Sequence, residues 1–177
     1  ERCDSLVVDP HKWLLSPFDC AALIYRDPTP ARLAHTQHAG YLDAIIDDAV
    51  YNPADHAHVL TRRARGVPFW FSLAVHGTDA YRDAIEQTLS VARATRDLVV
   101  AAEYLELLVE PELSVVAFRR RGWGADDYQA WCDRLMADGT AMLTPTTFEG
   151  SPAMRVCIIN PRTTLDDLVE IFATLEP

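Results

Sequence analysis

The stretch SLVVDPHKWLLSPFDC, residues 5–20, joins a short apolar run to a lysine through a proline. Residues 5–9 are mostly aliphatic and β-branched and stop at Pro10, a pattern that predicts a buried strand entering a turn. His11 and Lys12 then follow the C-terminal end of that strand. Ligands of open α/β sheets bind at this edge, so we expect a functional site here.

Lys12 is also the only lysine of the chain, because fifteen of its sixteen basic residues are arginines. A bias toward arginine codons would explain the arginines. Arginine cannot, however, replace lysine where the amine must lose its proton and act as a nucleophile. Lys12 is therefore the first candidate for a covalent role.

The formal net charge of −10 makes a nucleic acid or an anionic membrane surface an unsuitable partner, since both would repel the chain. No apolar stretch approaches the ~20 residues that span a bilayer, and the first residues lack the basic-then-apolar order of a signal peptide. We therefore expect a cytoplasmic protein without nucleic-acid or membrane partners.

The sequence divides near residue 65. Residues 1–65 hold two predicted strands, at 5–9 and 20–25, and a long stretch from 28 to 60 without periodicity, which predicts a loop. Two strands and a loop cannot cover their own hydrophobic faces, so we expect an N-terminal part to be missing.

Residues 66–177 predict a small α+β domain with helices on one face of an antiparallel sheet. After Gly77, Thr78 is expected to cap a long helix, while Gly139 and the capping box at Thr164 bound two further helices. The expected helices lie at 68–73, 78–102, 125–138 and beyond 164, and the expected strands at 104–109, 114–119, 141–144 and 154–159.

The run DPHKWLL at 9–15, followed by PFDC at 17–20, resembles the cofactor-lysine signature of group II pyridoxal-phosphate-dependent amino-acid decarboxylases, which include aromatic-amino-acid, histidine and glutamate decarboxylases. The resemblance extends through 61–71 and 154–164 and covers the whole chain, at the place of the family's C-terminal two-fifths. It implies an α/β fold: residues 1–65 end the large, cofactor-binding domain of an aminotransferase-like (fold type I) enzyme and carry its catalytic loop, and residues 66–177 form its small C-terminal α+β domain.

The resemblance also implies roles for the residues around the lysine. Lys12 would form a Schiff base with the aldehyde of pyridoxal 5′-phosphate. His11 would lie near the cofactor phosphate and offer it an N–H donor, although a purely structural histidine remains an alternative. Asp9 occupies a position close to that phosphate in the family, but its carboxylate would repel a phosphate unless it turned away, so its role stays open.

Two further residues are implicated by the same resemblance. Tyr41, in the sequence GYLD at 40–43, resembles the tyrosine of the family's mobile loop, which delivers a proton to the substrate Cα. Arg155 shares one strand face with Ala153, Cys157 and Ile159 and corresponds to an arginine that handles the substrate carboxylate. The alternatives are an ordinary loop tyrosine and an arginine in a structural ion pair.

The implied activity is the decarboxylation of an L-amino acid, with an aromatic one favoured, to its amine and CO2 by a homodimer. Aldehyde synthesis or the decarboxylation of acidic or diamino acids remains open, as does a non-catalytic interaction fragment. Because the remaining cofactor-binding residues of the family would precede Glu1, the chain alone is expected to be inactive. No metal site is expected, since the histidine pairs at 35/38 and 56/58 lack a cysteine or carboxylate partner.

Overall fold

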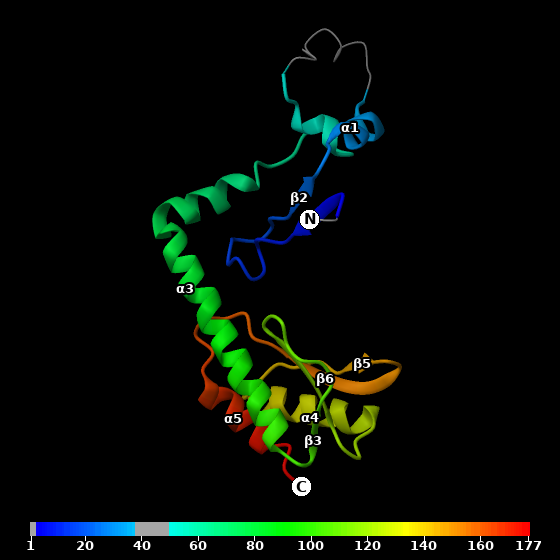
Figure 1. The fold of residues 1–177 in the computed structure, drawn as a ribbon, viewed down its shortest axis with the longest axis vertical. Coiled ribbons are helices and arrows are strands. Elements are labelled where there is room, and N and C mark those ends of the chain that lie inside the picture. Colours follow the sequence, from blue (N-terminus) through cyan, green and yellow to red (C-terminus); the bar gives the residue numbers. More distant parts are fainter. Residues whose placement is uncertain (1–2, 38–49) are drawn as a thin grey trace. The chain divides into compact units, whose positions relative to one another are not determined.

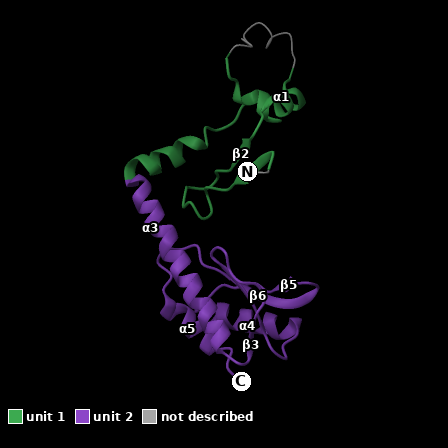
Figure 2. Ribbon diagram, viewed as in Figure 1, with its two compact units in different colours: residues 1–75 green, residues 76–177 purple. Residues whose placement is uncertain are grey.

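The computed structural model describes residues 3–37 and 50–177 (Figure 1). Their contacts divide the chain into two compact units, residues 1–75 and 76–177 (Figure 2). The domain boundary expected at residues 65/66 concerns a longer enzyme and stays a prediction.

The two strands of the first unit flank the lysine stretch. β1 (Ser5–Val8) pairs antiparallel with β2 (Ala22–Tyr25), with Val8 opposite Ala22. Their aliphatic side chains remain about half exposed: Leu6 51%, Val7 65%, Leu23 49% and Ile24 55%. Apolar strands form by burying such side chains, so this small sheet has an apolar surface that the described residues do not cover.

Two short helices lie in the stretch for which the sequence predicts a loop. α1 (Thr29–His35) follows Pro28 and has a proline in its first turn, and the 3-10 helix η1 (Pro53–His56) begins with a proline after its cap, Asn52. Proline suits a first helical turn because the amide hydrogen that it lacks would have no helical partner there. These prolines start helices, and the predicted loop is wrong for these residues.

A glycine interrupts the long helix α3 (Gly66–Ala101), as the sequence predicts. Gly77 has φ 77° and ψ 160°, so two helical segments meet at this residue. That backbone region is essentially restricted to glycine, because a Cβ atom would clash there. The predicted break between the two helices is confirmed.

The second unit contains a four-stranded antiparallel sheet with the order β3-β4-β6-β5. Its strands are β3 (Leu105–Leu107), β4 (Val115–Arg120), β5 (Thr146–Phe148) and β6 (Ser151–Cys157). The strands predicted at 104–109, 114–119 and 154–159 are confirmed, but the strand predicted at 141–144 is wrong. The chain instead forms β5 after Pro145 and returns through a two-residue turn. Both turn residues, Glu149 and Gly150, have positive φ, which suits a tight hairpin.

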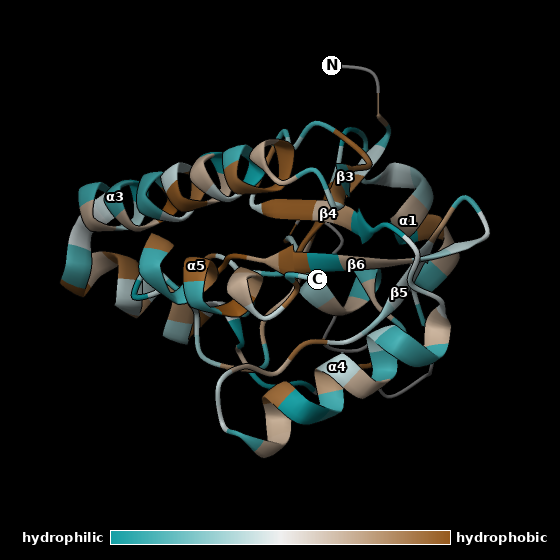
Figure 3. Ribbon diagram, turned by 90° about the horizontal axis from the view of Figure 1, so that it is seen from below, coloured by the Kyte–Doolittle hydropathy of each residue, from teal (hydrophilic) through white to brown (hydrophobic). Residues whose placement is uncertain are grey.

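One face of this sheet is covered by helices. Val116 and Phe118 of β4 alternate with exposed or half-buried residues, and Met154 and Val156 oppose them on β6; all four are buried. They pack with buried side chains of α3, α4 (Ala125–Ala137) and α5 (Leu165–Ala173). Figure 3 shows β4 as largely hydrophobic, whereas α4 alternates along its length. Full burial of such a side chain contributes about 1.5–3 kcal/mol, so this cluster is the main core of the unit.

The predicted C-terminal end of α4 and the predicted N-terminal end of α5 are confirmed. Gly139, with φ 73°, ends the turn after α4. The Thr164 hydroxyl accepts the Asp167 amide hydrogen over 3.2 Å, and the Asp167 carboxylate accepts the Thr164 amide hydrogen over 2.8 Å. This reciprocal pair is the predicted capping box of α5.

Candidate active site

The loop after β1 presents Lys12 at the surface. The Lys12 amide donates to the Asp9 carbonyl oxygen over 2.9 Å, the Leu15 amide to that of Lys12 over 3.2 Å, and the Ser16 amide to that of Pro10 over 2.9 Å. These short-range hydrogen bonds fold residues 9–16 into consecutive turns. The Lys12 side chain is 65% exposed, so its amine is accessible just beyond a strand end, where the sequence predicts it.

Lys12 and Asp9 form an ion pair within this loop. The Nζ atom of Lys12 lies 2.6 Å from Oδ2 of Asp9. The hydrogen bond from Lys12 lowers the pKa of the Asp9 carboxyl below its ordinary value. The carboxylate therefore faces the lysine amine and pairs with it.

His11 closes the loop against Cys20. The Cys20 amide donates to Nδ1 of His11 over 3.1 Å, and the Cys20 carbonyl oxygen lies 2.5 Å from the same nitrogen. The His11 amide also donates to this carbonyl oxygen, over 3.3 Å. The Phe18 ring packs edge-on against the imidazole, with ring centroids 5.1 Å apart. Because Nδ1 is engaged, Nε2 is the ring nitrogen that can reach an anion.

Asp19, one residue before Cys20, has two arginine partners that the sequence does not reveal. Its Oδ1 atom accepts from Nη2 of Arg63 over 2.7 Å, and its Oδ2 atom accepts from Nε of Arg65 over 2.9 Å. The hydrogen bond from Arg65 is the main reason that the pKa of Asp19 lies below its ordinary value. The only signals in the sequence were the place of Asp19 in the PFDC motif and the cluster of arginines at 62–65.

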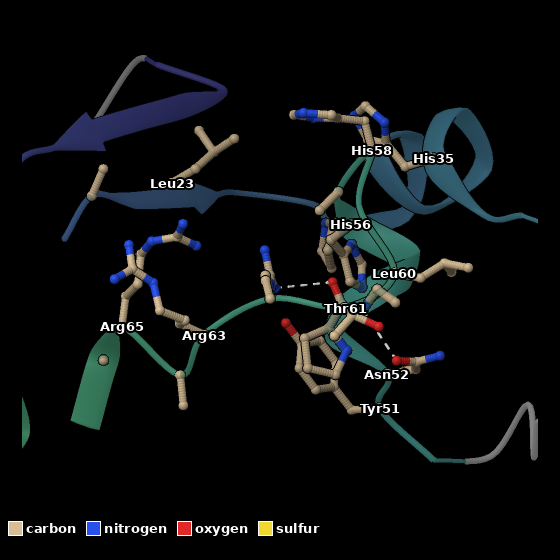
Figure 4. A pocket seen from close by; sticks show the side chains of 18 of the residues that line it. Leu23, His35, Tyr51, Asn52, His56, His58, Leu60, Thr61, Arg63 and Arg65 are labelled. Atoms are coloured by element: carbon tan, nitrogen blue, oxygen red, sulfur yellow. Dashed lines mark hydrogen bonds between the residues drawn. The ribbon is translucent and has the colours of Figure 1, made fainter. Parts of the chain in front are cut away.

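A hollow of about 1020 Å³ lies beside β2 within the first unit (Figure 4). Residues of β2, α1, η1 and the segment 57–66 line it, including three arginines and three histidines. Tyr51 and His56 stack at one wall, with ring centroids 5.3 Å apart. Lys12 does not line this hollow, so the exposed amine and the basic hollow are separate features of the unit.

Two further candidates, Arg155 and Tyr41, belong to other parts of the sequence. Arg155 lies opposite Ala117 of β4, and its side chain is exposed, away from the neighbouring core residues. Among the residues that the structure describes, no ion pair or hydrogen bond of its side chain is found. Tyr41 lies outside the described residues, as does His38. The structure thus groups Asp9, His11 and Lys12, while the roles of Tyr41 and Arg155 stay predictions.

Within residues 3–37 and 50–177, none of the helices combines the length and the apolar composition that a membrane span requires. The same residues include no group of three or more histidine, cysteine, aspartate or glutamate side chains arranged to hold a metal ion.

Comparisons with known proteins connect the lysine loop to a family. Residues 1–121 match the model of the pyridoxal-dependent decarboxylase conserved domain. The chain is 27% identical to the aromatic-L-amino-acid decarboxylase of Bacillus atrophaeus over 99% of its own length and 38% of the relative's. It is 34% identical to the L-2,4-diaminobutyrate decarboxylase of Rhizobium meliloti over 94% of its own length and 35% of the relative's.

A solved structure shares the fold. The crystal structure of Oryza sativa TDC with PLP and tryptamine superposes with a TM-score of 0.84 at 24% identity, covering 98% of this chain and 38% of that one. The α/β fold expected from the sequence is confirmed, and the chain spans less than two-fifths of the length of each of these proteins. Since the family model matches more than half of its residues, the chain belongs to the pyridoxal-dependent decarboxylase family.

Proposed function

We propose that the protein to which these residues belong decarboxylates an L-amino acid with pyridoxal 5′-phosphate, and that Lys12 is the residue that bonds the cofactor. The observation that carries the proposal is the accessible Lys12 amine at the end of β1, in a loop fixed by His11 and Cys20. Membership of the decarboxylase family supports it. Because the chain spans only part of its relatives, the activity is proposed for the whole protein.

The loop fits the aldehyde and phosphate ends of this cofactor. A lysine amine is the group that bonds the aldehyde, and the Lys12 side chain is exposed enough to meet it. In the tautomer in which Nδ1 of His11 accepts the Cys20 amide hydrogen, Nε2 carries the proton and offers a donor to the phosphate. The Asp9 carboxylate lies against the Lys12 ammonium, which lessens the repulsion that its charge would exert on an approaching phosphate.

When bound, the cofactor supplies an electron sink that stabilises the charge left behind by CO2. The residues of this chain would orient the reactants around it. Asp9 holds the Lys12 ammonium until the amine is needed, and His11 fixes the loop through its hydrogen bonds with Cys20. Arg155 would grip the substrate carboxylate with its planar guanidinium. Tyr41 would donate the proton that replaces the carboxylate on Cα.

An aromatic amino acid is the proposed substrate, and a diamino acid is the second candidate. The relatives reported above support both, because one decarboxylates aromatic L-amino acids and the other, at 34% identity, L-2,4-diaminobutyrate. We also propose that the whole protein is a homodimer, in keeping with the family resemblance. In this chain, the apolar surface of β1 and β2 is available to further segments of the protein.

The full-length protein tests this proposal directly. We expect CO2 release from L-tryptophan, L-tyrosine or L-2,4-diaminobutyrate when pyridoxal 5′-phosphate is added, with one amine formed per CO2. Lys12→Ala should abolish turnover, and Lys12→Arg should do the same, because arginine keeps the positive charge but cannot serve as the nucleophile. Formation of an aldehyde with ammonia and hydrogen peroxide would reassign the reaction. Full turnover by Lys12→Ala would refute the role of Lys12.

A further inference from the structure

Asp19 connects the lysine loop to the segment that leads into α3. We propose that Asp19, with Arg63 and Arg65, is a positioning residue: this fork of two ion pairs fixes the loop that carries Lys12. The inference rests on the proposed function of Lys12 and adds three residues to the site. None of them touches the reacting atoms.

The connection runs through short contacts in the first unit. Asp19 is bonded to Cys20, and the Cys20 backbone binds His11, the residue before Lys12. At its other end, Asp19 accepts from Arg63 over 2.7 Å and from Arg65 over 2.9 Å. Arg65 immediately precedes the first residue of α3. The lysine loop is thus tied to a segment that lies 44 and 46 residues further along the chain.

The two carboxylate oxygens have separate partners. Oδ1 accepts from Arg63, whereas Oδ2 accepts from Arg65. Two charge-assisted hydrogen bonds to different oxygens fix the orientation of the carboxylate as well as its position. A single ion pair would fix only one of the two oxygens, so the fork is better suited to holding the orientation of the carboxylate.

The exposure of these side chains indicates that the fork does not serve mainly for stability. The Arg63 side chain is 76% exposed, that of Arg65 39% and that of Asp19 30%. Ion pairs this close to solvent stabilise a protein little, because water and salt screen them. Positioning is the more suitable role, since a small displacement of a reacting group lowers the rate strongly even when the fold is intact.

The hydrogen bonds around Lys12 show why its loop would depend on such an anchor. The turns from Asp9 to Ser16 are held by contacts among near neighbours, and the Lys12 side chain projects outward from them. The hydrogen bonds between His11 and Cys20 and the fork at Asp19 attach this loop to residues further along the chain. Without the fork, the His11–Cys20 contact would stay, but the carboxylate beside it would lose its two fixed partners.

The test compares Asp19→Asn with Asp4→Asn in the full-length protein. Asp4 pairs with Arg26 over 3.7 Å at the other end of the same strand pair and is almost fully exposed, so it controls for the loss of one negative charge. We expect Asp19→Asn to lower kcat about 10- to 100-fold, with KM changed by less than about twofold. The visible absorbance of the lysine-bound cofactor should weaken or shift, while the thermal midpoint stays near that of the wild type. Asp4→Asn should match the wild type.

Two further variants separate positioning from a general defect. Asp19→Glu keeps the carboxylate and should recover part of the lost kcat. Arg63→Gln/Arg65→Gln removes the same two ion pairs from the other side, and combining it with Asp19→Asn should add little, because the three residues act as a unit. If Asp19→Asn fails to fold, the double arginine variant gives the same readouts.

The failures of the two proposals are distinguishable. If Lys12→Ala abolishes the lysine-bound absorbance while Asp19→Asn and the double arginine variant keep wild-type kcat and absorbance, only the positioning role is overturned. The positioning role also fails if Asp19→Glu folds but is as slow as Asp19→Asn. If Lys12→Ala itself keeps the absorbance and activity, the proposed function fails first.

Discussion

Replacing Tyr128 with phenylalanine should destabilise the second unit by about 1–3 kcal/mol. Tyr128 is fully buried, and its hydroxyl accepts the Arg120 amide hydrogen over 2.8 Å. The pairing of β4 with β6 runs from Val115 to Phe118, so Arg120 lies beyond it and its amide relies on the tyrosine. Burial raises the pKa of Tyr128, which keeps the phenol neutral in ordinary buffers.

The size of this destabilisation follows from the Arg120 amide, which loses its acceptor. Phenylalanine keeps the ring in the core but removes the acceptor, so a partly buried N–H donor loses its hydrogen bond. A cost of about 1–3 kcal/mol corresponds to about a 5- to 150-fold rise in the equilibrium constant for unfolding of this unit. This strand end matters for the site because β4 supports β6, which carries Arg155.

Hydrogen exchange of peptides from β4 and α4 measures the effect locally, alongside urea unfolding of the chain. Tyr104→Phe is the matched control. The Tyr104 ring lies under the Arg120 guanidinium, 5.4 Å from its centroid, but no hydrogen bond of its hydroxyl is found among the described residues. It should change stability by less than about 0.5 kcal/mol. Equal exchange rates in the two variants would refute the proposed role of the Tyr128 hydroxyl.

Three further predictions concern separate features. Gly77→Ala should cost about 1–3 kcal/mol in urea unfolding, because its φ and ψ are restricted to glycine, whereas Gly66→Ala should be nearly neutral; equal effects would contradict this account of the helix break. Hydrogen bonds from Thr164 lower the pKa of Asp167, so the capping box should stabilise α5 fully at pH values above the ordinary aspartate pKa of about 3.9. This contribution should be lost as the pH falls through the lower pKa of the folded state. Asp167→Asn should remove the resulting pH dependence of amide exchange in α5. In the full-length enzyme, Arg155→Lys should raise KM about tenfold or more if two-point binding of the carboxylate matters, and an unchanged KM would exclude that role.

Local sequence patterns predicted the features that depend on neighbouring residues. The turn at Lys12 follows from an aliphatic run that meets a proline, and the bounds of the later helices follow from Gly77, Gly139 and Thr164. Each of these signals acts within a few residues, so one sequence contains the information. The family resemblance then gave the chemistry to Lys12.

The features that the sequence did not predict depend on contacts between residues far apart in the chain, or on turns whose residues give only a weak sequence signal. Asp19 meets Arg63 and Arg65 across more than forty residues, a distance at which no periodic pattern connects them. The hairpin of β5 and β6 turns on Glu149–Gly150, where a non-glycine residue has φ 50°. α1 was not predicted because residues 28–60 show no helical periodicity, although the proline in its first turn suits a helix start.

The covalent bond between Lys12 and the cofactor is the central claim, and peptide mass spectrometry after borohydride reduction of the full-length protein tests it most directly. Reduction fixes the cofactor to the amine that holds it. Lys12 is the only lysine of residues 1–177, so within this chain a lysine adduct can form only there. The account predicts a phosphopyridoxyl adduct on the peptide that contains Lys12 and none with Lys12→Ala. An active enzyme whose adduct maps to another peptide would contradict it.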